Sequence, residues 1–252
     1  MDDLFFFDAD CRVGSGPVIG IQPGVKELLA EMDHFGIDKA VVQHGSTGML
    51  GAAQANLQIA EMLKEDTEER LTGIWYFLPT QCRELPEPDE FFRQMKENRI
   101  RLLALNPYEH QFIPHRISIG KIMDAAKERN IPIFLREFSG QWRDLYDFIE
   151  RFPENIFIYC DRVGKWGHDR KIRPLLENYS RFYYGMSGYW VPEGIRDLAD
   201  AYGADRLLYS SGFPYYIQGS GMTQLKFCGL NEKEIAAIAG KNLEKILSEV
   251  QL

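Results

Sequence analysis

The side chains best suited to chemistry follow the first apolar segment of the chain, in residues 5–14 (FFFDADCRVG). Three consecutive phenylalanines are typical of a short strand that is buried on both faces. Asp8, Asp10 and Arg12 occur at a spacing of two, which on a strand places the three side chains on one side. Because an unpaired buried charge is very unfavourable, we expect Asp10 and Arg12 to have buried partners in a site. The alternative is an ordinary strand end with solvated charges.

The overall composition excludes some classes of function. A hydrophobic content of 45% with 26% charged residues is ordinary for a soluble globular protein, and the net charge of −8 argues against a nucleic-acid surface. No apolar run approaches the roughly 18 residues of a membrane span, and the N-terminus does not resemble a signal peptide. The four cysteines have no metal-binding spacing, so we expect free thiols and a cytoplasmic location.

Short apolar segments alternate with amphipathic segments over the whole chain. The expected strands are residues 5–13, 39–44, 71–78, 100–105, 131–135, 156–160, 181–186 and 207–210. The expected helices are residues 24–35, 50–65, 88–98, 117–129, 141–152, 170–178 and 192–202, followed by one or two helices over residues 231–250 that a capping box of Asn231 and Glu234 opens. This alternation predicts a (β/α)8 TIM barrel, as a single domain over residues 1–252. A doubly wound sheet is the alternative, but no GxGxxG motif follows the first strand.

In such a barrel the working residues lie at the carboxyl ends of the strands and in the loops that follow. Those positions hold the following polar and charged residues: Asp10, Arg12, His44, Asn106, Tyr108, Glu109, Arg136, Glu137, Asp161, Arg162, Ser187 and Ser211. His44 is suited to general acid or base catalysis, because an unshifted imidazole titrates near neutral pH. Cys11 and Cys160 also lie near the mouth, and we expect both to be buried, inert thiols.

Four stretches of the chain resemble the amidohydrolase superfamily, in its amidohydrolase-related branch of metal-dependent TIM-barrel hydrolases and decarboxylases. They are residues 7–14, 28–42, 203–214 (GADRLLYSSGFP) and 238–243 (IAGKNL), which match the opening strand, the first helix with the second strand, the eighth strand and the closing helix. The resemblance spans nearly the whole chain. It implies a TIM-barrel hydrolase whose cofactor would be zinc or another divalent metal.

The family's metal ligands are replaced in this sequence. Asp10 and Arg12 stand where the family has a His-x-His pair, and three further ligand positions fall on or beside Arg136, Arg162 and Gly212. Arginine cannot ligate a metal, because its guanidinium stays protonated and has no free lone pair. The resemblance therefore implies a degenerate metal site, and we expect no metal or other cofactor. A relocated metal stays open as an alternative, with the ligands His44, His110, His115 and Asp10.

By this resemblance, Arg12, Arg136 and Arg162 meet where the metal ligands would converge. One interpretation is a cationic pocket that holds a carboxylate or phosphate, because guanidinium groups bind such anions in a bidentate manner. The other interpretation is a closed network of salt bridges with three acids, namely Asp10, Glu137 and Asp161. A buried arginine cluster without an acidic partner would be too repulsive, so we expect Asp10 to be engaged.

We expect a hydrolase that acts on a small anionic substrate without a metal, with arginines stabilising an oxyanion. Asp10 and His44 are the expected catalytic residues, and the expected substrate-binding residues are Arg12, Asn106, Tyr108, Arg136, Glu137, Arg162 and Ser211. The alternative is a non-catalytic barrel that binds a small anion or a protein partner. An unpaired base beside a free arginine would favour the enzyme, and a mouth closed by ion pairs would favour the binding protein. The sequence leaves open whether the chain forms a homo-oligomer.

Overall fold

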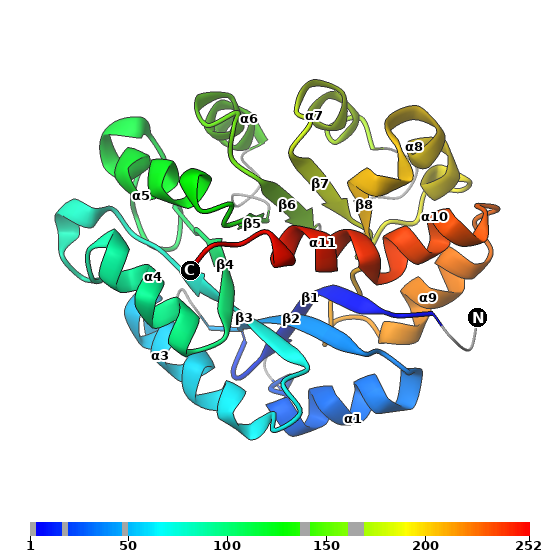
Figure 1. Cartoon of the computed structure of the whole chain (residues 1–252), viewed down its shortest axis with the longest axis horizontal. Helices are drawn as coiled ribbons and strands as arrows, with labels where there is room; N and C mark the ends of the chain where they lie inside the picture. The colour runs from blue at the N-terminus through cyan, green and yellow to red at the C-terminus, as the bar shows by residue number, and fades with distance from the viewer. Residues whose placement is uncertain (1–3, 17–19, 47–49, 137–141, 161–168) are drawn as a thin grey trace.

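The structure, a computed structural model, describes residues 4–16, 20–46, 50–136, 142–160 and 169–252. Eight parallel strands form one sheet, in which each strand pairs with the next along the chain (Figure 1). They are β1 (Phe7–Val13), β2 (Lys39–His44), β3 (Leu71–Tyr76), β4 (Ile100–Ala104), β5 (Ile133–Leu135), β6 (Phe157–Cys160), β7 (Phe182–Gly185) and β8 (Leu207–Leu208). The expected (β/α)8 barrel is thereby confirmed.

Backbone hydrogen bonds between β1 and the residues that follow β8 close the barrel. The amide of Ala9 donates to the carbonyl oxygen of Tyr209, and the amide of Gly212 donates to that of Asp10, each at 3.0 Å. The residues after β8 therefore continue alongside β1 as far as the mouth. This closure brings the carboxyl end of the last strand next to Asp10.

Helices surround the sheet, as the alternating pattern predicted (Figure 1). They are α1 (Val25–Phe35), α3 (Ala52–Met62), α4 (Pro88–Glu97), α5 (Arg116–Glu128), α6 (Trp142–Arg151), α7 (Arg173–Asn178), α8 (Gly194–Tyr202), α9 (Gln218–Lys226), α10 (Glu232–Ala236) and α11 (Asn242–Ser248). The expected capping box opens α10, with Asn231 and Glu234 each accepting the other's backbone N–H at 3.0 Å. Within the described residues, no helix has the length and apolar content needed to cross a membrane.

Helix α9 was not predicted, because its sequence QGSGMTQLK has little apolar periodicity and begins with residues of low helix propensity. Its glycines have a packing role. A Cβ on Gly219 would lie 2.4 Å from the Phe35 ring, and one on Gly221 would lie 3.1 Å from the Tyr209 ring. The absence of these side chains lets α9 approach α1 and the end of β8 closely.

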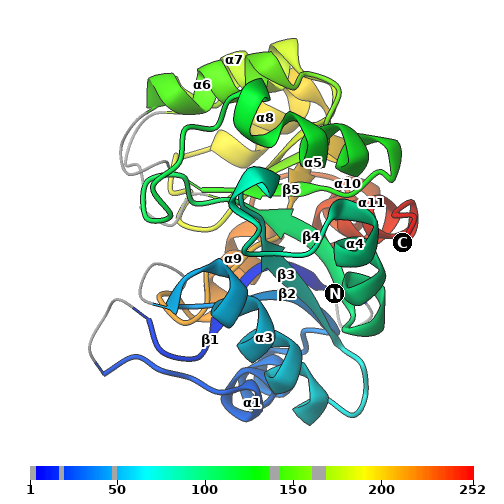
Figure 2. The same cartoon turned by 90° about the vertical axis from the view of Figure 1, so that its left-hand side faces the viewer.

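The buried apolar residues form two clusters, which show the direction in which each strand residue faces. The outer cluster lies between strands and helices and includes Val42 and Trp75. The inner cluster fills the barrel and includes Val41 and Ile74, together with three residues of α11, namely Leu243, Ile246 and Leu247. Helix α11 closes the amino-terminal end of the barrel, at the right of Figure 2, opposite to the mouth.

A β-bulge in β1 changes which of its residues face the barrel. Asp8 is in register with Ala40 of β2 and Cys11 with Val42, so β1 advances three residues where β2 advances two. An extra residue of this kind interrupts the alternation of side chains along a strand. The expectation that Asp8, Asp10 and Arg12 share one side is therefore wrong for Asp8, as the contacts of Asp8 and Asp10 below confirm.

Candidate functional site

A buried ion pair crosses the mouth of the barrel, between Asp10 of β1 and Arg136, which directly follows β5. Nη2 of Arg136 donates to Oδ1 of Asp10. The Asp10 side chain is fully buried, and the Arg136 side chain is 17% exposed. The hydroxyl of Ser187, after β7, lies 3.4 Å from Oδ2 of Asp10 and donates to it weakly. The expected buried partner of Asp10 is thus an arginine from the far side of the barrel.

Asp8 lies behind this ion pair, on the side of β1 that faces α9. Its Oδ1 accepts the amide of Ser211 at 2.9 Å and the amide of Asp10 at 3.1 Å. Its Oδ2 accepts Nε2 of Gln218, the first residue of α9, at 2.9 Å. The carboxyl group therefore connects the β1 bulge, the end of β8 and α9, and it holds the backbone of Asp10 directly.

The burial of Asp8 affects its own protonation and that of its neighbours. Burial raises the pKa of Asp8, and the hydrogen bonds from Ser211 and Gln218 oppose this only in part. Burial, and then the proximity of Asp8, raise the pKa of the Cys11 thiol well above its usual range. Burial does the same to Cys160. Both buried thiols are therefore protonated and unreactive at neutral pH, as expected.

Three polar residues on the inner face, Gln43, Tyr76 and Ser210, were not among the residues predicted at the strand ends, whereas their neighbour Ser187 was. Gln43 is fully buried, and its Oε1 accepts the Tyr76 hydroxyl at 2.6 Å. Oγ of Ser210 accepts the amide of Ser187 at 2.7 Å. Gln43 and Tyr76 each follow an inner-cluster residue, Val41 and Ile74, by two positions. That spacing was the sequence signal that could have identified them.

His44 lies on the outer side of β2. It is in register with Val13, a member of the outer cluster, and its Nδ1 accepts the amide of Ser46 at 3.2 Å. A Cβ on Gly14 would lie 2.4 Å from Nε2 of His44, so the loop after β1 packs against the imidazole. Because burial lowers the pKa of His44, the ring is neutral at pH 7.

Ser211 also faces away from the ion pair. Its Oγ accepts the amide of Phe213 at 3.0 Å and lies 3.9 Å from Sγ of Cys11. The preceding residue, Ser210, is the one that faces the barrel. Both predicted residues, His44 and Ser211, directly follow the residue that faces the barrel. Adjacent side chains of a strand point to opposite sides, so an error of one residue in the prediction selects a side chain on the wrong side.

Buried nitrogen donors without partners occur on the ion pair itself and on the inner face of β2. Nε and Nη1 of Arg136 and Nε2 of Gln43 have no hydrogen-bond partner among the described residues. Arg12 is in register with Gln43, and its guanidinium carbon lies 5.8 Å from the centre of the Tyr215 ring. An unsatisfied buried donor costs about 1–3 kcal/mol. These donors therefore favour a ligand with several acceptor oxygens.

The predicted residues in the loop after β4 contact other residues of that loop and its surroundings. Nδ2 of Asn106 donates to Oε2 of Glu109 at 2.6 Å. Tyr108 is 69% exposed and borders a cavity of about 420 Å³ between this loop and α6. Nδ1 of His115 accepts the amide of Ile117 at 3.3 Å at the start of α5. Two further predicted substrate-binding residues, Glu137 and Arg162, lie outside the described residues.

Comparison with known protein families identifies the family of this barrel. Residues 22–248 match the family described as Amidohydrolase. The chain belongs to the amidohydrolase family. The resemblance inferred from the strand and helix motifs is thereby confirmed. No curated protein matches the chain.

Solved structures similar to this chain share its fold at low sequence identity. A 5-carboxyvanillate decarboxylase from Sphingomonas paucimobilis is 15% identical with a TM-score of 0.73, over 98% of this chain and 99% of that one. A probable 2-pyrone-4,6-dicarboxylic acid hydrolase from Acinetobacter baumannii, with citric acid bound, is 14% identical with a TM-score of 0.72, over 96% and 99%. A 5-carboxyvanillate decarboxylase from Novosphingobium aromaticivorans, complexed with manganese and 4-hydroxy-3-methoxy-5-nitrobenzoic acid, is 13% identical with a TM-score of 0.73, over 98% and 97%.

The described residues of this chain do not fit the divalent metal that the family implies. Asp10 is already bound to the Arg136 guanidinium, whose positive charge would repel a metal ion. In the described part of the chain, no group of three or more His, Cys, Asp or Glu residues could hold a metal ion. The alternative of a relocated metal is therefore wrong for its four proposed ligands, all of which are described: His44, His110, His115 and Asp10.

Proposed function

We propose that this amidohydrolase binds a small organic carboxylate in the barrel mouth and hydrolyses it without a divalent metal. The observation that carries the proposal is the set of buried nitrogen donors without partners, on Arg136 and Gln43. Acceptor oxygens of a carboxylate would satisfy them, and a guanidinium group matches that geometry. The names of the similar structures, which include carboxylic acid decarboxylases and a dicarboxylic acid hydrolase, support the same class of substrate.

In the proposed reaction, water attacks the carbonyl carbon of an ester or amide bond in the bound acid. Negative charge then develops on the carbonyl oxygen, and the Arg136 guanidinium stabilises it. Asp10 holds Arg136 in place with Oδ1, and its Oδ2 accepts the proton of the attacking water. The tetrahedral intermediate then collapses, the bond from the carbonyl carbon to the ester oxygen or amide nitrogen breaks, and Asp10 returns the proton to that leaving atom. His44 has no part in this reaction, because it lies on the outer side of β2.

A non-catalytic anion-binding barrel is the second candidate. The buried ion pair favours it, because Asp10 is engaged with Arg136 and the mouth lacks a described base without a partner. The two candidates share the carboxylate site and differ only in turnover. A screen for binding must therefore be followed by assays of product formation, including release of carbon dioxide because decarboxylases occur among the similar structures.

A thermal-shift screen of aromatic carboxylates, dicarboxylates, sugar phosphates and lactones tests the proposed site. A carboxylate at 100 times its Kd is expected to stabilise the fold by about 2.7 kcal/mol. For a chain of this size that is a rise in Tm of roughly 5–10 °C. The shift should disappear in Arg136→Met and persist in Arg143→Met, which removes an exposed arginine on α6. Equal shifts in wild type and Arg136→Met would place the anion site elsewhere, and a flat screen would contradict the proposal.

We expect the purified protein to contain far less than one equivalent of zinc, manganese or iron per chain. The reason is the donor set that the structure describes at the mouth, where an arginine is bound to the carboxylate of Asp10. Elemental analysis measures the metal content, and unfolding with and without a chelator measures its effect on stability. About one equivalent of metal, removed by chelator with loss of stability, would contradict metal-independent function.

A further inference from the structure

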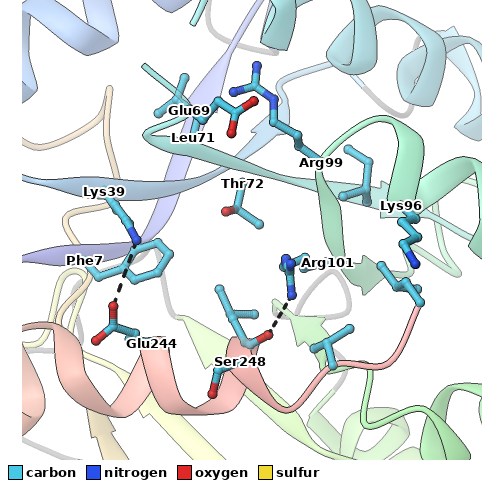
Figure 3. Close-up of a pocket in the computed structure, with 14 residues that line it drawn as sticks. Phe7, Lys39, Glu69, Leu71, Thr72, Lys96, Arg99, Arg101, Glu244 and Ser248 are labelled. Carbon is cyan, nitrogen blue, oxygen red and sulfur yellow. Dashed lines mark hydrogen bonds and ion pairs between the residues drawn. The ribbon is translucent and has the colours of Figure 1, made fainter. Parts of the chain in front are cut away.

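A cavity with charged lining residues lies at the amino-terminal end of the barrel, opposite to the mouth (Figure 3). It has a volume of about 600 Å³. The first residues of β1 to β4 border it on one side, and α11 with the residues that follow it on the other. Since the reacting groups of TIM barrels lie at the carboxyl ends of the strands, this cavity is separate from the proposed catalytic site.

The charged residues at this cavity are mostly cations. They are Lys39, Lys96, Arg99 and Arg101, together with two acids, Glu69 and Glu244. Nη1 of Arg99 serves the fold itself, because it donates to the carbonyl oxygen and to Oδ2 of Asp66, each at 3.1 Å. Lys39 and Glu244 are 4.0 Å apart, which is a loose ion pair between half-exposed side chains. Among the remaining charged residues, Lys96 and Arg101 contribute two positive charges and Glu69 one negative charge, so the cavity has an excess of positive charge.

A second β-bulge places Arg101 at this cavity. Gly73 of β3 is in register with Ile100 of β4, but the next residue, Ile74, is in register with Leu102. Arg101 is therefore the extra residue of β4. Bulges often redirect a side chain near a functional site. Here Nη1 of Arg101 donates to the carbonyl oxygen of Leu247 on α11 at 3.1 Å, and the side chain is exposed at the cavity.

The polar groups surround one space between β3 and α11. In Figure 3, Lys39 and Arg101 lie on opposite sides of Thr72, whose hydroxyl is between them. Apolar side chains of Phe7, Leu247 and others complete the walls. Such a lining combines a guanidinium fork, a point positive charge and a neutral hydroxyl donor, which are the groups that recognise an oxyanion.

We propose that this cavity is a second binding site, which holds the carboxylate or phosphate group of a small organic anion between Arg101 and Lys39. The guanidinium of Arg101 binds two oxygens of the anion, and Lys39 moves from Glu244 towards the bound charge. A ligand here connects β2 and β4 to α11 and so stabilises the closure of the barrel end. The site takes no part in the proposed hydrolysis.

Calorimetric titration of the full chain with inorganic phosphate and with benzoate tests this site, using Arg136→Met as the background in which the mouth is disabled. One molecule per chain is expected to bind, more weakly at high salt because the cations are solvent-exposed. Arg101→Met in this background should weaken binding by at least about tenfold, because charge-assisted hydrogen bonds to the anion are lost. Arg101→Lys should weaken it less. Arg143→Met in the same background is the control and should leave the affinity unchanged.

Lys39→Met gives an independent test that does not disturb β4, and it should also weaken binding in the Arg136→Met background. If Arg101→Met does not fold, the Lys39→Met result decides. No binding of either anion in the Arg136→Met background would overturn the second site. An affinity that is unchanged by both Arg101→Met and Lys39→Met would also overturn it. A negative result in the screen of the mouth alone would contradict the proposed function but not the second binding site, because the two sites share no residue.

Discussion

Asp10→Ala is expected to lower the free energy of unfolding by about 3–5 kcal/mol, because it leaves the Arg136 charge without a partner in a largely buried position. The guanidinium would keep its charge, since arginine does not deprotonate in proteins. The double variant Asp10→Ala/Arg136→Met should recover part of the loss, because it removes both charges. Urea unfolding of the two single variants and the double variant measures the coupling between the residues.

Asp124→Ala is the matched control for this experiment. It breaks a pair with Arg116 in which both side chains are about half exposed, and such a pair contributes about 1 kcal/mol or less. A loss below about 1 kcal/mol for Asp10→Ala would show that the mouth is hydrated and that its ion pair contributes little. A double variant less stable than either single variant would show that packing of the Arg136 stem, and not the charge pair, stabilises this end of the barrel.

Asp8→Ala and Asp8→Asn are expected to differ strongly. In Asp8→Ala, three buried donors lose their acceptor, namely the amides of Asp10 and Ser211 and Nε2 of Gln218. At about 1–3 kcal/mol for each unsatisfied donor, a loss of roughly 3–9 kcal/mol follows, and the lower half of this range is expected because Nε2 of Gln218 keeps a weak acceptor, Sγ of Cys11 at 3.7 Å. Asn at this position keeps one acceptor oxygen for the two amides. Its NH₂ group meets Nε2 of Gln218 and can donate to Oε1 of Gln218, which is buried without a partner, once the Gln218 amide turns over. Asp8→Asn should therefore cost less than Asp8→Ala, at about 1–3 kcal/mol for the one donor that loses its acceptor.

Wild type and Asp8→Asn are also expected to differ in how their stability depends on pH. Burial raises the pKa of Asp8 in the folded state above the value of about 3.9 expected when unfolded. The stability that protonated Asp8 contributes is therefore present below about pH 4 and is lost as the pH rises through the folded pKa. Asp8→Asn has no such group, so its stability relative to wild type should increase from pH 4 towards pH 7. Parallel unfolding midpoints over this range would contradict a raised pKa.

The barrel could be predicted from the sequence because its strands are buried on both faces. Such strands occur as short apolar runs, for example residues 71–78 and 156–160, and each was followed by an amphipathic segment. These patterns depend on neighbouring residues only. Helix α9 could not be predicted in this way, because its glycines are there for contact with Phe35 and Tyr209, which are distant in sequence.

The sequence by itself determined that Asp10 and Arg136 lie at strand ends, and hence at the mouth, because their segments end at them. Only the tertiary structure decided which neighbours face inward. The bulge in β1 depends on pairing with β2 and on the contacts of Asp8 with Ser211 and Gln218. Side chains alternate along a strand, so a shift of one residue in the pairing of β2 would turn His44 towards the mouth in place of Gln43. Register is set by long-range hydrogen bonds, which local sequence patterns do not contain.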